Sequence, residues 1–243
     1  MNKIKNILKL NPLFSDFEDL INIRLQDNFG HINQSFYSYS ELKLLAACET
    51  HAEKHSTGNV HENVLGVVHP FYMHLRPKHK MELTQDTQND AQEYLNNIIS
   101  LLTDERRNYS IILFDTAHNY ANSTSNLAEL GLIDDIIFTQ PITGHFVNDT
   151  KAVTILEKYM HSDFYIAGAY TGTTPRETGN FACVGDVEEK IKYHINKEVK
   201  LIQNCCIYSP IFEKRELLTI PPLYNTSSLT DFFIKTENIV LPK

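Results

Sequence analysis

The chain has 243 residues, of which 42% are hydrophobic and 21% charged, and its formal net charge is -8 at pH 7. This composition excludes disordered, collagen-like and low-complexity chains, and it supplies enough apolar side chains for a sizeable core. A negative chain without a long run of Lys or Arg also argues against nucleic-acid binding, which depends on neutralising phosphates.

The sequence favours a soluble protein of a reducing compartment. No apolar run approaches the ~20 residues needed to cross a bilayer, and residues 1–13 interrupt their apolar positions with Asn and Lys, unlike a signal peptide. The cysteines show no C-x-x-C spacing, which is typical of reduced thiols; they are Cys48, Cys183, Cys205 and Cys206. We expect a cytoplasmic protein without a membrane partner, and the Asn, Ile and Lys content is typical of an AT-rich bacterial genome.

The first sixty residues have a helical pattern. The expected helices cover residues 4–10, 16–25 and 40–55. Ser38 and Glu41 have the spacing of a capping box at the start of the third helix. We interpret residues 1–61 as a helical amino-terminal extension.

From residue 64 onward, short apolar runs alternate with amphipathic segments, as in repeated βαβ units. The expected strands cover residues 64–68, 110–114, 135–139, 164–167 and 199–203. The expected helices cover residues 84–102, 126–130, 150–160 and 184–195, with a further helix at 229–234 and a last strand at 239–241. Continuous apolar strands with helical crossovers favour a parallel sheet covered on both faces. Residues 62–243 are therefore predicted to form a three-layer α/β/α domain with a mostly parallel sheet.

Polar side chains follow the ends of consecutive predicted strands. They are His69 after the first strand, Asp115 and His118 after the second, Gln140 and His145 after the third, and Cys183 after the fourth. Ligands of open parallel sheets bind outside the carboxyl ends of the strands, so we expect at least two of these residues to line one pocket. His145, Phe71 and Tyr170 are the expected substrate contacts.

Cys183 directly precedes the predicted helix 184–195. The positive end of a helix favours a thiolate, and the free N–H groups of the first turn can hold an oxyanion. The same position also suits a small buried apolar side chain, and both interpretations stay open. Cys205 and Cys206 fall in a strand pattern, where packing is the expected role.

The histidines and Asp115 also allow two interpretations. His69 can act as a general base or satisfy a buried loop carbonyl. Asp115 and His118 suit a pair of metal ligands or an oriented base, but Asp is also a common turn residue. A third ligand for a divalent metal would be His69, His74 or His145, and no other cofactor is expected. The remaining histidines of the first third, His51, His55 and His61, are expected at the surface.

The order of these segments resembles the isochorismatase-like cysteine hydrolases, which include nicotinamidases, over about residues 62–210. The similar segments are VLGVVHPF, IILFDTAH, IIFTQPITGHF, FYIAGAYTG, ACVGDVEEKI and VKLIQNCCIYS. The family has a catalytic acid after its first strand, a lysine ahead of a turn, and a Cys-Val pair that opens a helix. Cys183 matches the nucleophile of that pattern, whereas His69 stands at the position of the acid and Gln140 at that of the lysine. Residues 173–181 are additional.

Three functions follow as hypotheses. In the first, the resemblance implies a divergent cysteine hydrolase in which Cys183 attacks a small amide- or ester-like substrate and His69 is the base. In the second, the scaffold is catalytically degenerate and serves binding or regulation, with the extension as a surface for a partner or a homo-oligomer. The third is a metal-dependent hydrolase that uses Asp115 and His118.

Overall fold

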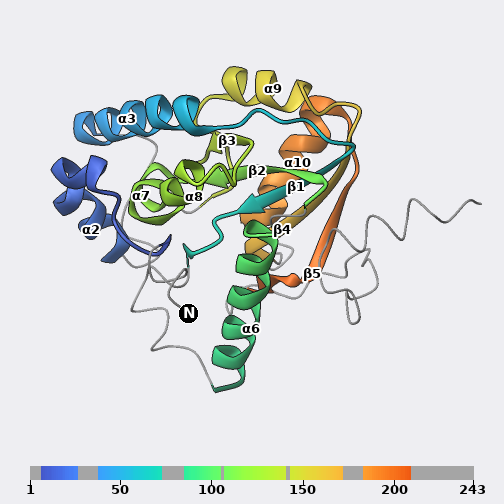
Figure 1. The fold of residues 1–243 in the computed structure, drawn as a ribbon, viewed down its shortest axis with the longest axis horizontal. Helices are drawn as coiled ribbons and strands as arrows, with labels where there is room; N and C mark the ends of the chain where they lie inside the picture. Colours follow the sequence, from blue (N-terminus) through green and yellow to red (C-terminus); the bar gives the residue numbers. More distant parts are fainter. Residues whose placement is uncertain are drawn as a thin grey trace, which may run out of the picture.

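The computed structural model describes residues 7–26, 38–72, 85–104, 107–140, 143–171 and 183–208. Within these residues the chain forms an α/β fold around one five-stranded sheet (Figure 1). The strands are β1 (Asn63–Val68), β2 (Tyr109–Asp115), β3 (Asp135–Phe138), β4 (Asp163–Thr171) and β5 (Val199–Tyr208). They lie in the order β3-β2-β1-β4-β5, and every neighbouring pair is parallel.

The central strand, β1, determines where the strand order reverses. Its residue Val68 pairs with Phe114 of β2 on one side and with Gly168 of β4 on the other. The chain therefore builds one half of the sheet outward through β2 and β3, then returns to add β4 and β5. The boundary between β1 and β4 is a topological switch point, the place where open α/β sheets bind their ligands.

Helices cover both faces of the sheet. They are η1 (Pro12–Phe17), α2 (Glu18–Gln26), α3 (Tyr39–His55), α6 (Gln85–Leu102), α7 (Ala117–Asn119), η2 (Tyr120–Thr124), α8 (Ser125–Glu129), α9 (Asp149–Glu157) and α10 (Cys183–Ile195). None of the helices in the described ranges is long and apolar enough to cross a bilayer.

Alternate residues of the strands enter two separate apolar clusters, as the two-residue period of a strand requires. In β1, Leu65 and Val67 pack with α3, α6, α7 and α8, whereas Val64 and Val68 pack with α9 and α10. The result is three layers, with β1 and β2 wholly buried between them. Buried parallel strands of this kind are rich in Val, Ile and Leu.

The amino-terminal segment belongs to the first of these clusters. Ile7, Phe14 and Ile21 are buried together with side chains of the sheet. The predicted capping box at the start of α3 is confirmed, because the Ser38 N–H donates to Glu41 Oε2 at 2.7 Å and the Glu41 N–H donates to Ser38 Oγ at 3.3 Å.

The five predicted strands of residues 64–203 are confirmed, but β4 continues to Thr171 and β5 to Tyr208. Two helix predictions at the amino terminus need correction. Residues 8–10 are not helical, and the predicted helix 16–25 begins as a 3-10 helix at Pro12, where proline suits the first turn. Residues 4–6 of the helix predicted at 4–10, and the elements predicted at 229–234 and 239–241, lie outside the described residues.

Candidate functional site

His69 lies at the switch point, directly after β1, and is completely buried. Its backbone has a φ of 43°, a region that side-chain-bearing residues rarely adopt, and its N–H donates to Phe114 O at 2.9 Å. Its ring reaches past β2 to the end of β3, where Nε2 lies 2.7 Å from Thr139 Oγ1. The strand ends of one half of the sheet are thus joined through this imidazole.

Contacts between aromatic rings connect His69 to β4. The Tyr72 ring stacks on the His69 ring at a centroid distance of 5.9 Å and meets the Tyr170 ring edge-on at 5.8 Å. Two predicted site residues, His69 and Tyr170, are therefore brought together, and Tyr72 is the partner that the sequence analysis missed. The sequence feature that could have indicated Tyr72 is its position three residues after His69, at the end of a strand. Phe71, an expected substrate contact, is buried in the core.

Asp115 ends β2 as a buried carboxyl group with three hydrogen-bond donors. The Thr116 N–H and the Asn119 side-chain amide donate to its Oδ1 at 2.9 and 3.1 Å, and the Thr124 hydroxyl donates to Oδ2 at 2.8 Å. Burial raises the pKa of Asp115 to about 7, although these three hydrogen bonds act in the opposite direction. The carboxyl group therefore fixes the start of α7 and η2 and changes its protonation near neutral pH.

His118 was expected after the second strand, and it lies in the short helix α7, which Thr116 caps directly after β2. It is buried, and its Nε2 lies 3.8 Å from Glu41 Oε1 of α3. His74, one of the alternative metal ligands, lies outside the described residues.

Cys183 is the first residue of α10 and packs among apolar side chains on the α9 and α10 face of the sheet. The turn that carries Gly144 lies directly against it. A Cβ added to Gly144 would lie 2.2 Å from the Cys183 carbonyl oxygen and 2.7 Å from Asp186 Cβ. The Gly144 N–H donates to Asp186 Oδ2 at 3.0 Å. Asp186 thus fastens the turn to the helix that Cys183 opens.

Gln140 and His145 lie on that same turn. The Gln140 N–H donates to the His145 carbonyl oxygen at 2.8 Å, and the His145 side chain is exposed. This turn therefore lies beside the helix that Cys183 begins. The predicted residues nevertheless fall into two groups, because Asp115 bonds to residues of α7 and η2 on one face of the sheet, whereas Cys183 packs on the other.

His51 was predicted at the surface and is buried instead, with 7% of its surface exposed. The reason is helical periodicity: Leu44, Cys48 and His51 follow the i, i+4, i+7 spacing of one face, and that face of α3 packs on the sheet side. His55 is half-buried, and His61 is exposed as predicted. Within the described residues, His51, His55 and Glu129 form the group of three ligand-type side chains whose donor atoms lie within 4.8 Å of one another. Asp115 and His118 do not belong to it.

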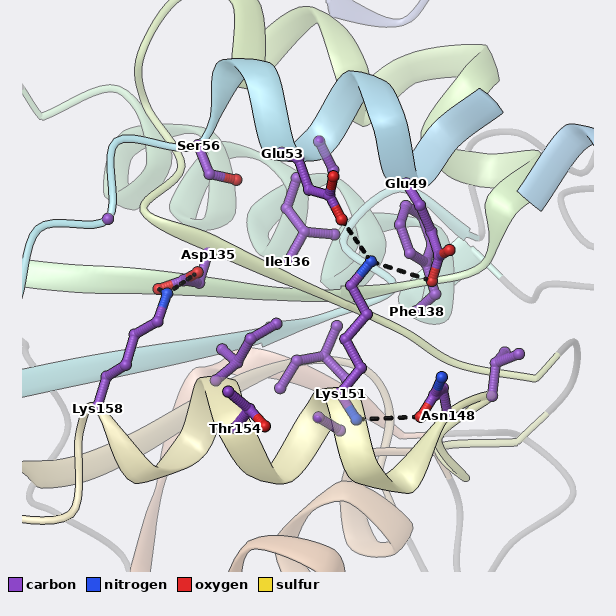
Figure 2. A pocket seen from close by; sticks show the side chains of 16 residues that line it. Glu49, Glu53, Ser56, Asp135, Ile136, Phe138, Asn148, Lys151, Thr154 and Lys158 are labelled. Atoms are coloured by element: carbon purple, nitrogen blue, oxygen red, sulfur yellow. Dashed lines mark hydrogen bonds and ion pairs between the residues drawn. The ribbon is translucent and has the colours of Figure 1, made fainter. Parts of the chain in front are cut away.

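A groove of about 400 Å³ opens between α3 and α9 (Figure 2). Cys183 is not among the residues that line it. Ile136 and Phe138 of the edge strand β3 line its floor. Lys151 of α9 spans it, with Nζ 2.8 Å from Glu53 Oε1 and 3.4 Å from Glu49 Oε1 on α3. The sequence could not indicate this groove, because it requires that β3 be an edge strand and that two helices distant in sequence flank it.

The backbone of β3 contributes polar groups to this groove. Thr139 N–H points inward, to Asp115 O, whereas Phe138 O accepts a hydrogen bond from Val147 N–H on the outer side. Because backbone direction alternates along a strand, the N–H and C=O of Ile136 also face outward. Among the residues described, no hydrogen bond to this pair is found.

Comparisons of the chain with protein-family models, curated proteins and solved structures return no match.

Proposed function

We propose that the protein is a divergent, isochorismatase-like cysteine hydrolase that acts on a small amide- or ester-like substrate through Cys183. The observation that carries the proposal is the position of this thiol at the first residue of a 13-residue helix, beside the turn that Gly144 and Asp186 hold in place. A helix amino terminus favours the thiolate and offers free N–H groups to an oxyanion.

In the proposed reaction, the Cys183 sulfur attacks the substrate carbonyl carbon, and His69 accepts the thiol proton. The oxyanion of the tetrahedral intermediate is held by N–H groups of the first turn of α10. Collapse of the intermediate breaks the bond to the amine or alcohol, which leaves with the proton from His69. Water then cleaves the thioester, releasing the carboxylic acid and restoring the thiol.

The proposal gives the other predicted residues supporting roles. Asp115 is a positioning residue, because its carboxyl group accepts hydrogen bonds from Thr116, Asn119 and Thr124 directly after β2. Thr139 orients the His69 ring through the bond to Nε2. Gln140 and His145 lie on the turn beside Cys183, where a substrate would pass.

The reactivity of Cys183 provides the first test. Iodoacetamide alkylation of the native protein, followed residue by residue with mass spectrometry, should modify Cys183 at least about tenfold faster than Cys48, Cys205 and Cys206. Those three thiols are internal references, since burial raises the pKa of each. The pH midpoint of the Cys183 reaction should fall below the ordinary thiol value of about 8.5, and His69→Gln should move it upward.

Turnover is measured with a panel of activated esters and primary amides. Cys183→Ala should abolish the hydrolysis of any substrate that the panel identifies, while Cys205→Ala keeps it. Hydrolysis that survives Cys183→Ala would rule out the mechanism.

The groove favours a second candidate, a non-catalytic scaffold that binds an extended peptide segment of a partner protein. The outward N–H and C=O of Ile136 match the backbone of an added strand, the floor is apolar, and charges of both signs line the rim. Cys183 alkylation no faster than that of the three reference thiols, together with no turnover of the panel, would favour this candidate over the hydrolase.

A further inference from the structure

Two histidines lie one helical turn apart on the inner side of α3, and a glutamate from α8 faces them. His51 and His55 have the i, i+4 spacing that puts two side chains on one helix face. Glu129 ends α8, and one donor atom from each of the three side chains lies within 4.8 Å of the other two. Two imidazoles and a carboxylate are a common ligand set of three-residue zinc sites.

The spacing of the donor atoms suits a tetrahedral ion. With zinc–ligand bonds of about 2.0–2.2 Å, neighbouring donors lie about 3.3–3.5 Å apart. His51 Nε2 is 3.2 Å from Glu129 Oε1. The His55 ring stacks on the His51 ring at a centroid distance of 4.4 Å. The His55 donor atom lies within 4.8 Å of the other two, and because this side chain is only half-buried, a rotation about its side-chain bonds can bring the atom to the tetrahedral spacing.

Neighbouring groups hold two of these ligands in place. The Tyr120 hydroxyl oxygen lies 2.8 Å from His51 Nδ1, and the Asn11 side-chain amide donates to Glu129 Oε1 at 2.8 Å. When His51 carries its proton on Nδ1 and donates it to Tyr120, the lone pair of Nε2 faces Glu129 and His55. Outer partners of this kind fix the tautomer and orientation of metal-bound histidines.

The composition of the ligand set also fits a divalent cation. Two imidazole nitrogens and one carboxylate oxygen supply three ligand atoms, as in zinc sites that keep a water molecule as the fourth ligand.

We propose that His51, His55 and Glu129 bind one Zn²⁺ ion, with water as the fourth ligand. The ion joins α3 to α8 and, through Asn11, to the segment ahead of η1. It therefore fastens the amino-terminal helices to the sheet domain and has no part in the hydrolysis assigned to Cys183.

The test uses the full chain after treatment with a chelator. Titration of Zn²⁺ against a chromophoric chelator should show one tightly bound ion per chain, and Co²⁺ should give the visible absorption of a four-coordinate site. Zn²⁺ should raise the midpoint of thermal unfolding of the unmodified chain. His55→Ala and Glu129→Gln should each lose the tight site, the cobalt spectrum and the thermal shift, whereas the exposed control His161→Ala keeps all three.

Tyr120→Phe separates the site from adventitious binding. It removes the hydroxyl beside His51 Nδ1 without removing a ligand, so the affinity for Zn²⁺ should fall by about tenfold or more. Circular dichroism of each variant verifies that it is folded. A chain that binds no Zn²⁺, or whose tight site survives both His55→Ala and Glu129→Gln, would overturn the proposal.

Discussion

At the residue scale, Asp115 shows how enclosure changes a carboxyl group. Its pKa is raised to about 7 by burial, from a value near 3.8 in the unfolded chain. Between these two values the folded protein holds a proton that the unfolded chain releases. The protonated Asp115 therefore contributes to the free energy of unfolding at low pH, and this contribution is lost as the pH rises from about 3.8 to about 7.

Asp115→Asn should remove this dependence, since the amide is neutral at every pH. The amide can keep the pattern of the protonated acid, because its oxygen accepts from Thr116 and Asn119 and its NH₂ group donates to the Thr124 hydroxyl. The variant should gain stability over the unmodified chain by up to about 4 kcal/mol between pH 4 and pH 8. Urea unfolding of both proteins at several pH values measures this difference, and a constant difference would contradict the assigned pKa shift.

Single residues of the site were predictable where their position follows from strand order. The positions of His69 and Asp115 at strand ends and of Cys183 at a helix start were predicted, because these residues follow apolar strands or precede an amphipathic segment. Their partners Thr139, Tyr72 and Asp186 were not found, since each contact joins loops from different parts of the chain. Periodicity carries no information on which loops cross, so the sequence could not show that Asp115 and Cys183 belong to opposite faces.

At the scale of elements, the contact between the Gly144 turn and α10 leaves no room for a side chain. Gly144→Ala would place a methyl group 2.2 Å from the Cys183 carbonyl oxygen, so the turn or the start of α10 must shift. We expect a loss of about 1–3 kcal/mol in the free energy of unfolding, as for other overpacked sites, and a changed alkylation rate of Cys183.

Gly58→Ala is the matched control, because no atom lies within 4 Å of its added Cβ. Its φ of +67° alone should cost about 1 kcal/mol, with no effect on Cys183. Urea unfolding and thiol alkylation of both variants provide the comparison. Equal alkylation rates in the two variants would show that the turn does not position the cysteine helix.

The elements themselves were predictable to different degrees. The capping box of α3 and the apolar runs of β1 to β3 are local signals, and they gave the element limits to within one or two residues. The ends of β4 and β5 were underestimated, because the pairing of the two strands shifts register after Ile166 and resumes at Gly168 with Cys206. Such a shift depends on the neighbouring strand and has no local signal in the sequence. The interior position of His51 was missed because histidine was read as polar despite its place on the apolar face of α3.

At the scale of the whole molecule, one buried carboxylate joins distant parts of the chain. Asp134 accepts hydrogen bonds from the Ile111 N–H at 2.7 Å, from Arg107 Nη2 at 3.1 Å and from the Thr57 hydroxyl. These partners belong to β2, to the segment ahead of it and to the end of the amino-terminal extension. The carboxylate therefore connects the extension to the sheet.

Asp134→Asn should destabilise the protein by about 3 kcal/mol, because the amide cannot accept from all three donors and leaves the buried end of Arg107 without its charge partner. Asp149→Asn is the control at an exposed ion pair with Lys190, where a change within about 0.5 kcal/mol is expected. Chemical denaturation of the two variants measures both values. Equal effects would show that the connection through Asp134 does not stabilise the fold.

The sheet order also has a consequence for biosynthesis. β1 is complete early, but the β4 edge it needs is made about one hundred residues later, since Val68 pairs with Gly168. At translation rates of about 5–20 residues per second, this wait lasts about 5–20 s. During that time the edge of β1 that later pairs with β4 exposes unpaired backbone N–H and C=O groups, which can pair with other chains. We therefore expect newly made chains to require ribosome-associated chaperones, although the folded protein buries this edge.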